Sequence, residues 1–286
     1  MFTPKRRNAY LGIAIPASLI SDSLHLREKT IKAGIIARAA AIFRVDEVII
    51  YIDKHGVERE GELISTILSY CETPQYLRRH IYAFSTLLKY AGLLPPLKIP
   101  SHTVPTKIDD IKDECFREGV VTKVEKNISW VDIGLGEYYS IPSKLCKGDR
   151  VTIKCYKKDG KLNISLSSKD EVNIYWGYKV QYNYDTITRV VEKFNADLII
   201  ATSRYGNPIN KVVNNLSEKI RKSRRVLVLF GAPKEGLFEI CEKFNIKLED
   251  VADYIINFIP FQGCETIRTE EAVISTLSIL NALFDF

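Results

Sequence analysis

The sequence predicts an α/β fold built on a parallel sheet and interrupted by an inserted small β-barrel. Apolar strands alternate with helical segments in residues 8–94 and again in residues 174–286. Between these parts lie short, β-branched runs separated by glycine-containing turns. The alternation is typical of a parallel sheet covered by helices, whereas closely spaced short strands favour a barrel. We therefore expect one discontinuous domain (residues 1–97 and 171–286) and an inserted domain (residues 98–170).

The first part opens with an apolar strand, Tyr10–Ile15, and a helix that Ser21 or Asp22 would cap. A second strand, Val48–Ile52, is followed by two helical stretches that end at Gly92. The buried face of the first helix is predicted by an apolar stripe at helical spacing. This stripe consists of Ile31, Ile35, Ala39 and Ile42.

A proline-rich segment, Pro95–Pro105, marks the boundary to the inserted domain. It has four prolines in eleven positions, which excludes a helix or a central strand and indicates a linker. Asp159-Gly160 predicts a hairpin between the last two strands of the barrel. The five predicted strands are Val120–Val124, Ser129–Leu135, Tyr138–Ile141, Arg150–Tyr156 and Leu162–Leu166.

The inserted segment EGVVTKVEKNISWVDIGLGEYYSIP, followed by KGDRVTIKCY, resembles an OB-fold module of the kind that binds single-stranded RNA. Such a module stacks bases on exposed aromatic rings beside cationic side chains. Alternatively, about half of the aromatic residues belong to the barrel core, because strand residues alternate between two faces. The aromatic candidates are Trp130, Tyr138, Tyr139 and Tyr156, and the cationic candidates are Lys123, Lys126, Lys154, Lys157 and Lys158.

The third part returns to alternating strands and helices. A helix that starts at Asp185 turns Ile187, Val190, Val191 and Phe194 inward. Three strands are predicted after it: Leu198–Thr202, Val226–Phe230 and Tyr254–Ile259. Asn207-Pro208 is expected to start one helix, with Asn207 as its cap. Thr269 is expected to cap the last helix, which starts at Glu270.

Each of these three strands runs into a polar or glycine-containing loop, at residues 203–208, 231–237 and 259–272. The carboxyl ends of parallel strands share one sheet edge, which is where open α/β sheets bind ligands. The second loop lacks the Gly-Lys-Ser/Thr of a phosphate-binding loop, and no GxGxxG follows the first strand. All four histidines fall outside the loops. By elimination, the edge suits a neutral-to-cationic nucleoside held by backbone groups and apolar walls.

Composition limits the class of protein. Hydrophobic residues make up 46% and charged residues 27% of the 286 residues, which is typical of a globular protein with a sizeable core. The six cysteines are scattered, which predicts reduced thiols in a cytoplasmic protein and no metal site. The sequence predicts neither a secretory signal nor a membrane span. The net charge is +6. Basic clusters occur at residues 5–7, 78–80 and 219–225. They are either solvated surface or a surface that binds the phosphates of a nucleic acid.

Two of the loops resemble a known family. FGAPKEGL (230–237) and IPFQGCETIRTEEA (259–272) resemble the second and third cofactor loops of SPOUT-class RNA methyltransferases. The resemblance is strongest to the archaeal and eukaryotic branch with an inserted OB-fold, and it covers almost the whole chain. It implies a C-terminal trefoil knot, S-adenosylmethionine bound in a bent form within the knot, and a homodimer.

Carried over by position, this resemblance assigns seven residues to cofactor binding: Thr202, Gly231, Gly236, Ile259, Gln262, Gly263 and Thr266. Gly231 and Gly236 can alternatively serve only to shape a turn. The candidates for catalysis beside the pocket are Arg204, Glu265 and Arg268. Arg204 can stabilise a deprotonated acceptor, and Glu265 can accept a proton. Arg268 can instead form an ion pair with Glu270 or Glu271.

We therefore expect a methyltransferase that acts on structured RNA, with ribosomal RNA as the preferred substrate. The preferred acceptor is a uracil or pseudouridine nitrogen, and the ribose 2′-hydroxyl is the second choice. The alternative from another class is an RNA-binding assembly factor that binds the cofactor and has little or no catalytic activity.

Overall fold

The structure, a computed structural model, describes residues 3–82, 84–102, 107–111, 114–158 and 161–283. The chain divides into two compact units. The barrel unit consists of Met1–Arg6, Glu72–Thr86 and Leu97–Gly177, and the sheet unit of Arg7–Cys71, Leu87–Pro96 and Tyr178–Phe286. The predicted limits at residues 97/98 and 170/171 stay predictions. In the structure, residues 72–86 also cluster with the barrel.

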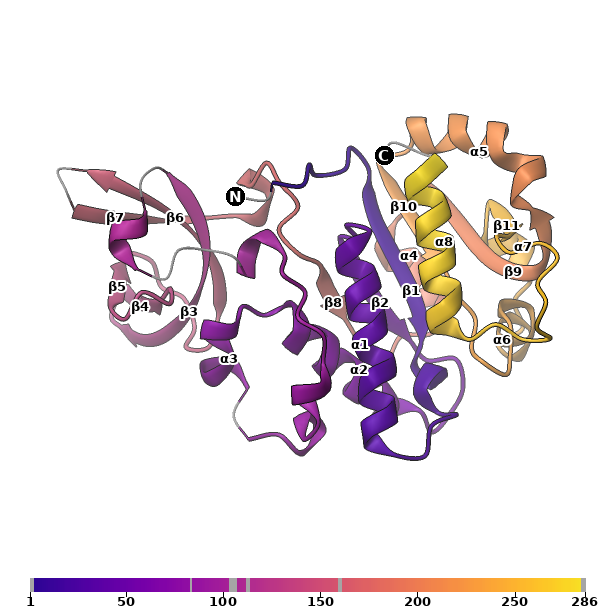
Figure 1. Ribbon diagram of the computed structural model, residues 1–286, viewed down its shortest axis with the longest axis horizontal. Coiled ribbons are helices and arrows are strands. Elements are labelled where there is room, and N and C mark those ends of the chain that lie inside the picture. The colour runs from indigo at the N-terminus through magenta and orange to yellow at the C-terminus, as the bar shows by residue number, and fades with distance from the viewer. Residues whose placement is uncertain (1–2, 83, 103–106, 112–113, 159–160, 284–286) are drawn as a thin grey trace. The chain divides into compact units, whose positions relative to one another are not determined.

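The sheet unit contains a six-stranded parallel sheet in the order β11-β9-β10-β1-β2-β8 (Figure 1). This confirms the predicted parallel sheet, which both ends of the chain supply. Every residue of β2 is buried, as expected for a central parallel strand. The strands are β1 (Tyr10–Pro16), β2 (Glu47–Tyr51), β8 (Lys179–Gln181), β9 (Leu198–Pro208), β10 (Arg225–Leu229) and β11 (Tyr254–Asn257).

Helices cover both faces of this sheet. In Figure 1, α1 and α8 lie side by side in front of it and α4 lies behind it. The core on the face of α4 and α6 includes Leu227 and Leu229 of β10, packed with Phe194 and Ile240. The helices of the unit are α1 (Leu26–Ile42), α2 (Glu58–Glu72), α4 (Ile187–Phe194), α5 (Ile209–Lys222), α6 (Leu237–Lys243), α7 (Leu248–Val251) and α8 (Thr269–Leu283), with short 3₁₀ turns η1 (Ala17–Ile20), η2 (Thr86–Leu88) and η3 (Ala91–Leu93).

The predictions for the first helix were wrong in two respects. α1 begins at Leu26, because the 3₁₀ turn η1 and an irregular stretch occupy residues 17–25 and leave neither Ser21 nor Asp22 as a cap. Its isoleucine stripe does not form the buried face, since Ile31 and Ile42 are 41% and 53% exposed. The buried face consists mainly of small residues, Ala33, Ala37, Ala39, Ala40 and Ala41, which let α8 pack closely against α1.

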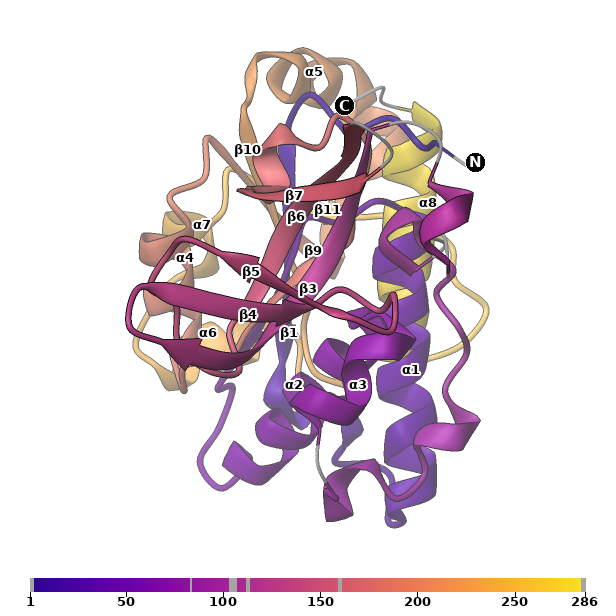
Figure 2. The ribbon, with the colours of Figure 1, turned by 90° about the vertical axis from the view of Figure 1, so that its left-hand side faces the viewer.

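The barrel unit contains a curled antiparallel sheet in the order β5-β4-β3-β6-β7 (Figure 2). The two outer strands of this order, β5 and β7, also approach each other. All five predicted barrel strands are confirmed, and the Asp159-Gly160 turn lies outside the described residues. The strands are β3 (Cys115–Glu125), β4 (Ile128–Asp132), β5 (Tyr138–Ile141), β6 (Arg150–Lys158) and β7 (Lys161–Ser167). Their core side chains are Val121, Val131, Ile133, Ile141, Ile153 and Cys155.

The proline-rich segment is packed rather than loosely extended. Leu97 and Ile99 are each 4% exposed within the barrel unit, and Pro100–His102 forms a 3₁₀ turn, η4. Residues 103–106 lie outside the described residues. The unit also contains α3 (Gln75–Ile81) and the 3₁₀ turns η5 (Ile108–Asp110) and η6 (Lys169–Glu171).

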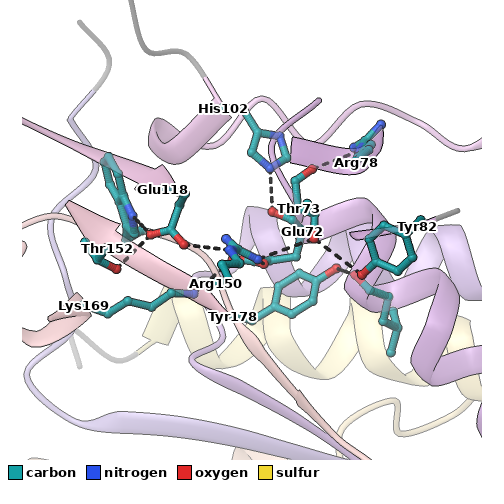
Figure 3. Close-up of polar contacts among 12 residues, drawn as sticks. Glu72, Thr73, Arg78, Tyr82, His102, Glu118, Arg150, Thr152, Lys169 and Tyr178 are labelled. Atoms are coloured by element: carbon teal, nitrogen blue, oxygen red, sulfur yellow. Dashed lines mark hydrogen bonds and ion pairs between the residues drawn. The ribbon is translucent and has the colours of Figure 1, made fainter. Parts of the chain in front are cut away.

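A buried ionic network attaches the start of the segment 72–86 to the barrel strands (Figure 3). Arg150 on β6 forms ion pairs with both Glu72 and Glu118. Burial alone would raise the pKa of Glu72, but the charges of Arg150 and Lys169 outweigh it and hold that pKa below its usual value of 4.5. The remaining donors to the two carboxylates are Lys169, Thr152 and Trp176.

Candidate functional site

Three loops of the sheet unit meet at one edge of the sheet and enclose a cavity of about 200 Å³. The first loop interrupts β9 after Ala201, and the other two loops follow β10 and β11. The three strands are neighbours in the sheet, so their carboxyl ends lie together. Eight of the ten predicted site residues line the cavity: Thr202, Arg204, Gly231, Gly236, Ile259, Gln262, Glu265 and Thr266. Gly263 and Arg268 are not among the lining residues, although they belong to the same loop.

The first loop is a detour within a strand. β9 continues to Pro208, but its pairing with β11 jumps from Ala201 to Asn207, so residues 202–206 leave the register. Gly206 allows the chain to return, because a Cβ there would lie 2.6 Å from the carbonyl oxygen of Ile255. The expected helix start at Asn207 is therefore wrong: Asn207 is a paired strand residue, and α5 begins at Ile209 with Pro208 before it.

Side chains of this detour contact the end of β10 and the third loop. The Thr202 hydroxyl donates to the carbonyl of Leu229 at 2.9 Å. Arg204 donates from Nη1 to the carbonyl of Glu265 at 3.1 Å and from Nη2 to the Tyr205 hydroxyl at 2.6 Å. The guanidinium also lies over the Tyr205 ring, 4.7 Å from its centroid. Arg204 is thus held at the cavity without a carboxylate partner among the described residues.

The second loop is a tight turn with two close glycines. The amide of Ala232 donates to the carbonyl of Glu235 at 2.8 Å, which closes the turn. A Cβ on Gly231 would lie 3.1 Å from the Cα of Gly236, so a larger residue would fit only if the backbone at Gly236 shifted slightly. The buried Tyr51 hydroxyl donates to the carbonyl of Phe230 at 2.6 Å and fixes the start of the loop.

The third loop is held by its own side chains. Asn257 accepts from the amide of Ile259 at 2.9 Å and donates to the carbonyl of Arg204 at 3.1 Å. The Gln262 amide nitrogen donates to the carbonyls of Cys264 and Glu265 at 2.8 and 3.2 Å. The Gln262 donors are therefore engaged within the loop, and only its carbonyl oxygen is left to face a ligand.

The start of α8 differs from the expected cap. Thr269 is the first helical residue, and its hydroxyl donates to the carbonyl of Gly231 at 2.9 Å instead of capping the helix. The carboxylate of Glu271 accepts from the amide of Arg268 at 2.9 Å, as the third residue of a helix often does. Among the described residues, the Arg268 side chain forms no ion pair with Glu270 or Glu271.

Several cavity-lining residues were not predicted. Tyr205 follows Arg204 directly, and an exposed aromatic residue beside an arginine was the available signal. Asn257 and Phe258 precede the predicted loop and read as ordinary strand residues in the sequence. The other unpredicted residues include Ala232, Pro233, Lys234, Glu239, Ile267 and Thr276.

The barrel aromatics divide between core and surface, as the alternative interpretation expected for about half of them. Tyr139 packs against the barrel core, whereas Tyr138 and Tyr156 are 56% and 36% exposed. Half-buried Trp130 lies opposite Lys123 and is flanked on β5 by Ser140. Among the predicted cations, Lys123 and Lys154 are paired with glutamates, and Lys126 and Lys157 are exposed.

The basic clusters are not equivalent. Arg6 pairs with Asp170, and Arg79 pairs with Asp132, so each of these two clusters has a cation that is paired within the barrel unit. The third cluster lies at the end of α5 and on the turn after it, and most of its cations are exposed. Those exposed cations are Lys219, Arg221, Lys222 and Arg224.

The described part of the chain contains no group of three or more histidine, cysteine, aspartate or glutamate side chains placed to hold a metal ion. None of its described helices combines the length and apolar character that crossing a membrane requires. The six cysteines are free thiols, and Cys115 lies directly opposite Cys155 in the pairing of β3 with β6.

Comparison with known proteins decides the family. A family model described as "Putative RNA methyltransferase" matches residues 10–280. The chain belongs to this RNA methyltransferase family. The match includes all three cavity loops and the whole barrel, so the expectation of an RNA methyltransferase family is confirmed.

Relatives of this RNA methyltransferase are similar along most of the chain. A 28S rRNA (uridine-N(3))-methyltransferase of Drosophila melanogaster is 31% identical over 94% of this chain and 61% of its own length. A human protein of the same name is 30% identical over 94% of this chain and 77% of its own. An uncharacterized protein of Halobacterium salinarum is 32% identical and is covered over 98% of its length. The chain thus spans less than two thirds of the Drosophila protein.

Proposed function

We propose that this protein is an S-adenosylmethionine-dependent methyltransferase that methylates ribosomal RNA at a base nitrogen, with uracil N3 as the preferred acceptor. The observation that carries the proposal is the single cavity formed by the three loops at the carboxyl edge of the parallel sheet. Membership of the RNA methyltransferase family supports the reaction class. The names of the fly and human relatives support the acceptor atom.

The cavity residues fit the proposed cofactor. Apolar walls from Ile256, Phe258 and Ile259 suit an adenine ring, while Gly231 and Gly236 bring backbone groups close to a ligand. The Gln262 carbonyl oxygen and the Thr266 hydroxyl can bond polar edges of the nucleoside. When bound, S-adenosylmethionine would supply an electrophilic methyl group on its sulfonium.

In the proposed reaction, the acceptor N–H of uracil would lose its proton, and the nitrogen would accept the methyl group that the sulfonium of bound S-adenosylmethionine would supply. The proton goes to Glu265, directly or through a water molecule, and S-adenosylhomocysteine is the second product. Arg204 faces the same cavity with no carboxylate partner among the described residues, so its charge is available to stabilise the uracil anion. Arg268, outside the lining, is assigned to RNA phosphate contact.

Three further features belong to the proposal. The C-terminal segment after β11 forms a trefoil knot of the SPOUT class, which the resemblance of residues 230–237 and 259–272 to the cofactor loops of that class supports. The barrel is an OB-fold that binds single-stranded RNA. Two observations support this part of the proposal: the curled five-stranded sheet and the exposed rings of Tyr138 and Tyr156. The active protein is a homodimer, as the SPOUT resemblance implies. The cytoplasmic location stays a prediction.

The decisive test uses the purified full chain, methyl-labelled S-adenosylmethionine and deproteinised large-subunit ribosomal RNA. We expect S-adenosylhomocysteine to bind in calorimetry and mass spectrometry of the digested RNA to find a methylated uracil base. Arg204→Ala should abolish the product, whereas Arg189→Ala, an exposed arginine on α4, should leave it unchanged. Methyl on the ribose would support the 2′-hydroxyl alternative. Cofactor and RNA binding without any product would support the assembly factor, and no cofactor binding would contradict both.

A further inference from the structure

Phe261 presents an aromatic ring to solvent at the edge of the cavity. Its side chain is 99% exposed, although Ile259, two residues before it, and Gln262, directly after it, both line the cavity. Its backbone φ is +60°, in the left-handed region that bulky residues rarely adopt. A glycine would relieve that strain and a polar residue would avoid the exposure, so nothing in the fold of this unit explains a phenylalanine here.

The loop that carries this ring is held firmly. Pro260 fixes the backbone before Phe261, and the Gln262 amide bridges two carbonyls after it. Arg204 holds the same loop through the carbonyl of Glu265. A loop constrained on both sides of a strained residue keeps its exposed ring at a defined place beside the cavity.

The three loops that form the cavity carry residues typical of a nucleic-acid contact. Tyr205, on the first loop, is 64% exposed and stacks with Arg204. Lys234 lines the cavity from the second loop, and Arg268 follows in the third. Among the described residues, none of these three cations is paired with a carboxylate. Glu239 and Glu265 also line the cavity, while Glu235 is already paired with Lys243. Exposed aromatics interleaved with available cations suit bases and phosphates rather than an apolar protein surface.

We propose that Phe261 stacks on a nucleobase of the RNA substrate and positions the acceptor over the cofactor cavity. The inference rests on the proposed function, since it presumes RNA at this edge of the sheet. Phe261 is a positioning residue: it touches the RNA beside the reacting base but takes no part in the chemistry. An enzyme that acts on a base must hold it out of its stack, and an exposed ring can replace the lost stacking partner.

The test compares Phe261→Ala and Phe261→Trp with the wild-type full chain, using a fluorescein-labelled 12-nucleotide oligouridylate and an abasic strand of the same length. Tyr184→Ala is the matched control, because Tyr184 is also exposed (54%) and left-handed (φ +57°). Tyr184 follows β8, at the sheet edge opposite β11. The affinity for S-adenosylhomocysteine and the thermal midpoint are measured for every variant.

We expect Phe261→Ala to weaken oligouridylate binding roughly 5- to 150-fold, the range for one lost base–aromatic stack. Its affinity for the abasic strand and for S-adenosylhomocysteine should stay unchanged, as should its thermal midpoint. Phe261→Trp should restore binding, and Tyr184→Ala should behave as wild type. An unchanged affinity for oligouridylate in Phe261→Ala would overturn the stacking role while leaving the methyltransferase proposal intact. If Phe261→Ala converts a dimer to a monomer, the ring is instead a contact between two copies of the chain, which would also overturn the stacking role. A wild-type chain that binds neither cofactor nor RNA would overturn both proposals.

Discussion

The hydroxyl of Thr269 donates to the carbonyl of Gly231 at 2.9 Å and thereby ties the start of α8 to the second cavity loop. Thr269 is 2% exposed, so this bond is shielded from water. The last helix of the chain thus sets the position of a loop that ends a central strand of the sheet. Both residues line the cavity, so we expect this bond to help shape it.

Replacing Thr269 by valine tests that dependence. The variant keeps the shape of the side chain but leaves the Gly231 carbonyl without its donor, which should cost about 1–2 kcal/mol of stability. We expect a lower midpoint in urea and a several-fold loss of S-adenosylhomocysteine affinity by calorimetry. Thr269→Ser keeps the hydroxyl and serves as the control. Equal cofactor affinity in Thr269→Val and the wild type would show that the bond does not shape the cavity.

Gly206→Ala should destabilise the sheet unit. The added Cβ would lie 2.6 Å from a backbone oxygen of Ile255, which cannot move without breaking the β9–β11 pairing. Overpacking of this kind costs roughly 1–3 kcal/mol, measurable by chemical denaturation. Gly92→Ala is the control, because a Cβ at Gly92 meets nothing within 4 Å. If both variants unfold at the same denaturant concentration, the close approach of Gly206 to the Ile255 backbone does not limit the stability of the unit.

Arg268→Ala should leave stability within about 0.5 kcal/mol of the wild type, because among the described residues its side chain forms no ion pair. Glu271→Gln should cost more, since the charge of its carboxylate strengthens the bond it accepts from the amide at the helix start. RNA affinity should fall in Arg268→Ala and become less dependent on salt, because a phosphate contact is lost. A marked loss of stability in Arg268→Ala would return this residue to a structural role.

The ionic network of the barrel unit predicts acid sensitivity. The pKa of Glu72 lies below its usual 4.5 in the folded chain, so the unfolded chain binds more protons on acidification. The stabilisation is complete above about pH 4.5 and is lost as the pH falls through the lowered pKa. Both tryptophans belong to the barrel unit, so their fluorescence follows its unfolding. We expect Glu72→Gln to flatten the dependence of stability on pH below 5.

Arg150→Met should be far more disruptive than loss of a surface cation. It removes the arginine shared by the carboxylates of Glu72 and Glu118, which are 3% and 1% exposed, at a cost of about 3–5 kcal/mol. Lys123→Met removes an exposed pair with Glu125 and should change stability by less than about 1 kcal/mol. Tryptophan fluorescence in guanidinium measures both. Similar midpoints for the two variants would contradict the structural importance of the network.

Cys115 should react unusually fast for a half-buried thiol. A hydrogen bond from Cys155, its cross-strand neighbour, lowers the pKa of Cys115 to about 7. The thiolate is the reactive form, so alkylation of Cys115 should rise steeply between pH 6 and 8. Cys155→Ala removes the donor and should shift that rise to higher pH, while exposed Cys146 gives the reference rate. Peptide mass spectrometry measures each site separately.

The sequence predicted the elements with a strong local pattern. Val226–Phe230 is a continuous apolar run, and it is the buried strand β10 with only its ends shifted by one residue. The barrel strands were recognisable from β-branched runs between glycine turns. The placement of the three loops at one edge followed from the rule that carboxyl ends of parallel strands share an edge.

The elements that the sequence failed to predict depend on tertiary contacts. β8 has three residues, too few for a period-two pattern, and gains its place by pairing with β2. The buried face of α1 was misassigned because α8 selects its alanines, which carry little hydrophobic signal of their own. The detour of β9 at residues 202–206 requires knowledge of its partner β11. The Thr269–Gly231 bond likewise joins residues 38 positions apart.

The central place of β1 has a consequence for synthesis of the protein. Ala14 pairs with Leu229, so 215 residues separate the two sides of this contact. At 5–20 residues per second, the ribosome needs roughly 10 to 40 s to deliver the second partner. Throughout that interval the nascent chain carries an apolar strand with an open hydrogen-bonding edge, a state prone to aggregation. The barrel unit emerges in the meantime and can fold first. We therefore expect the nascent sheet unit to need chaperone protection until β10 arrives.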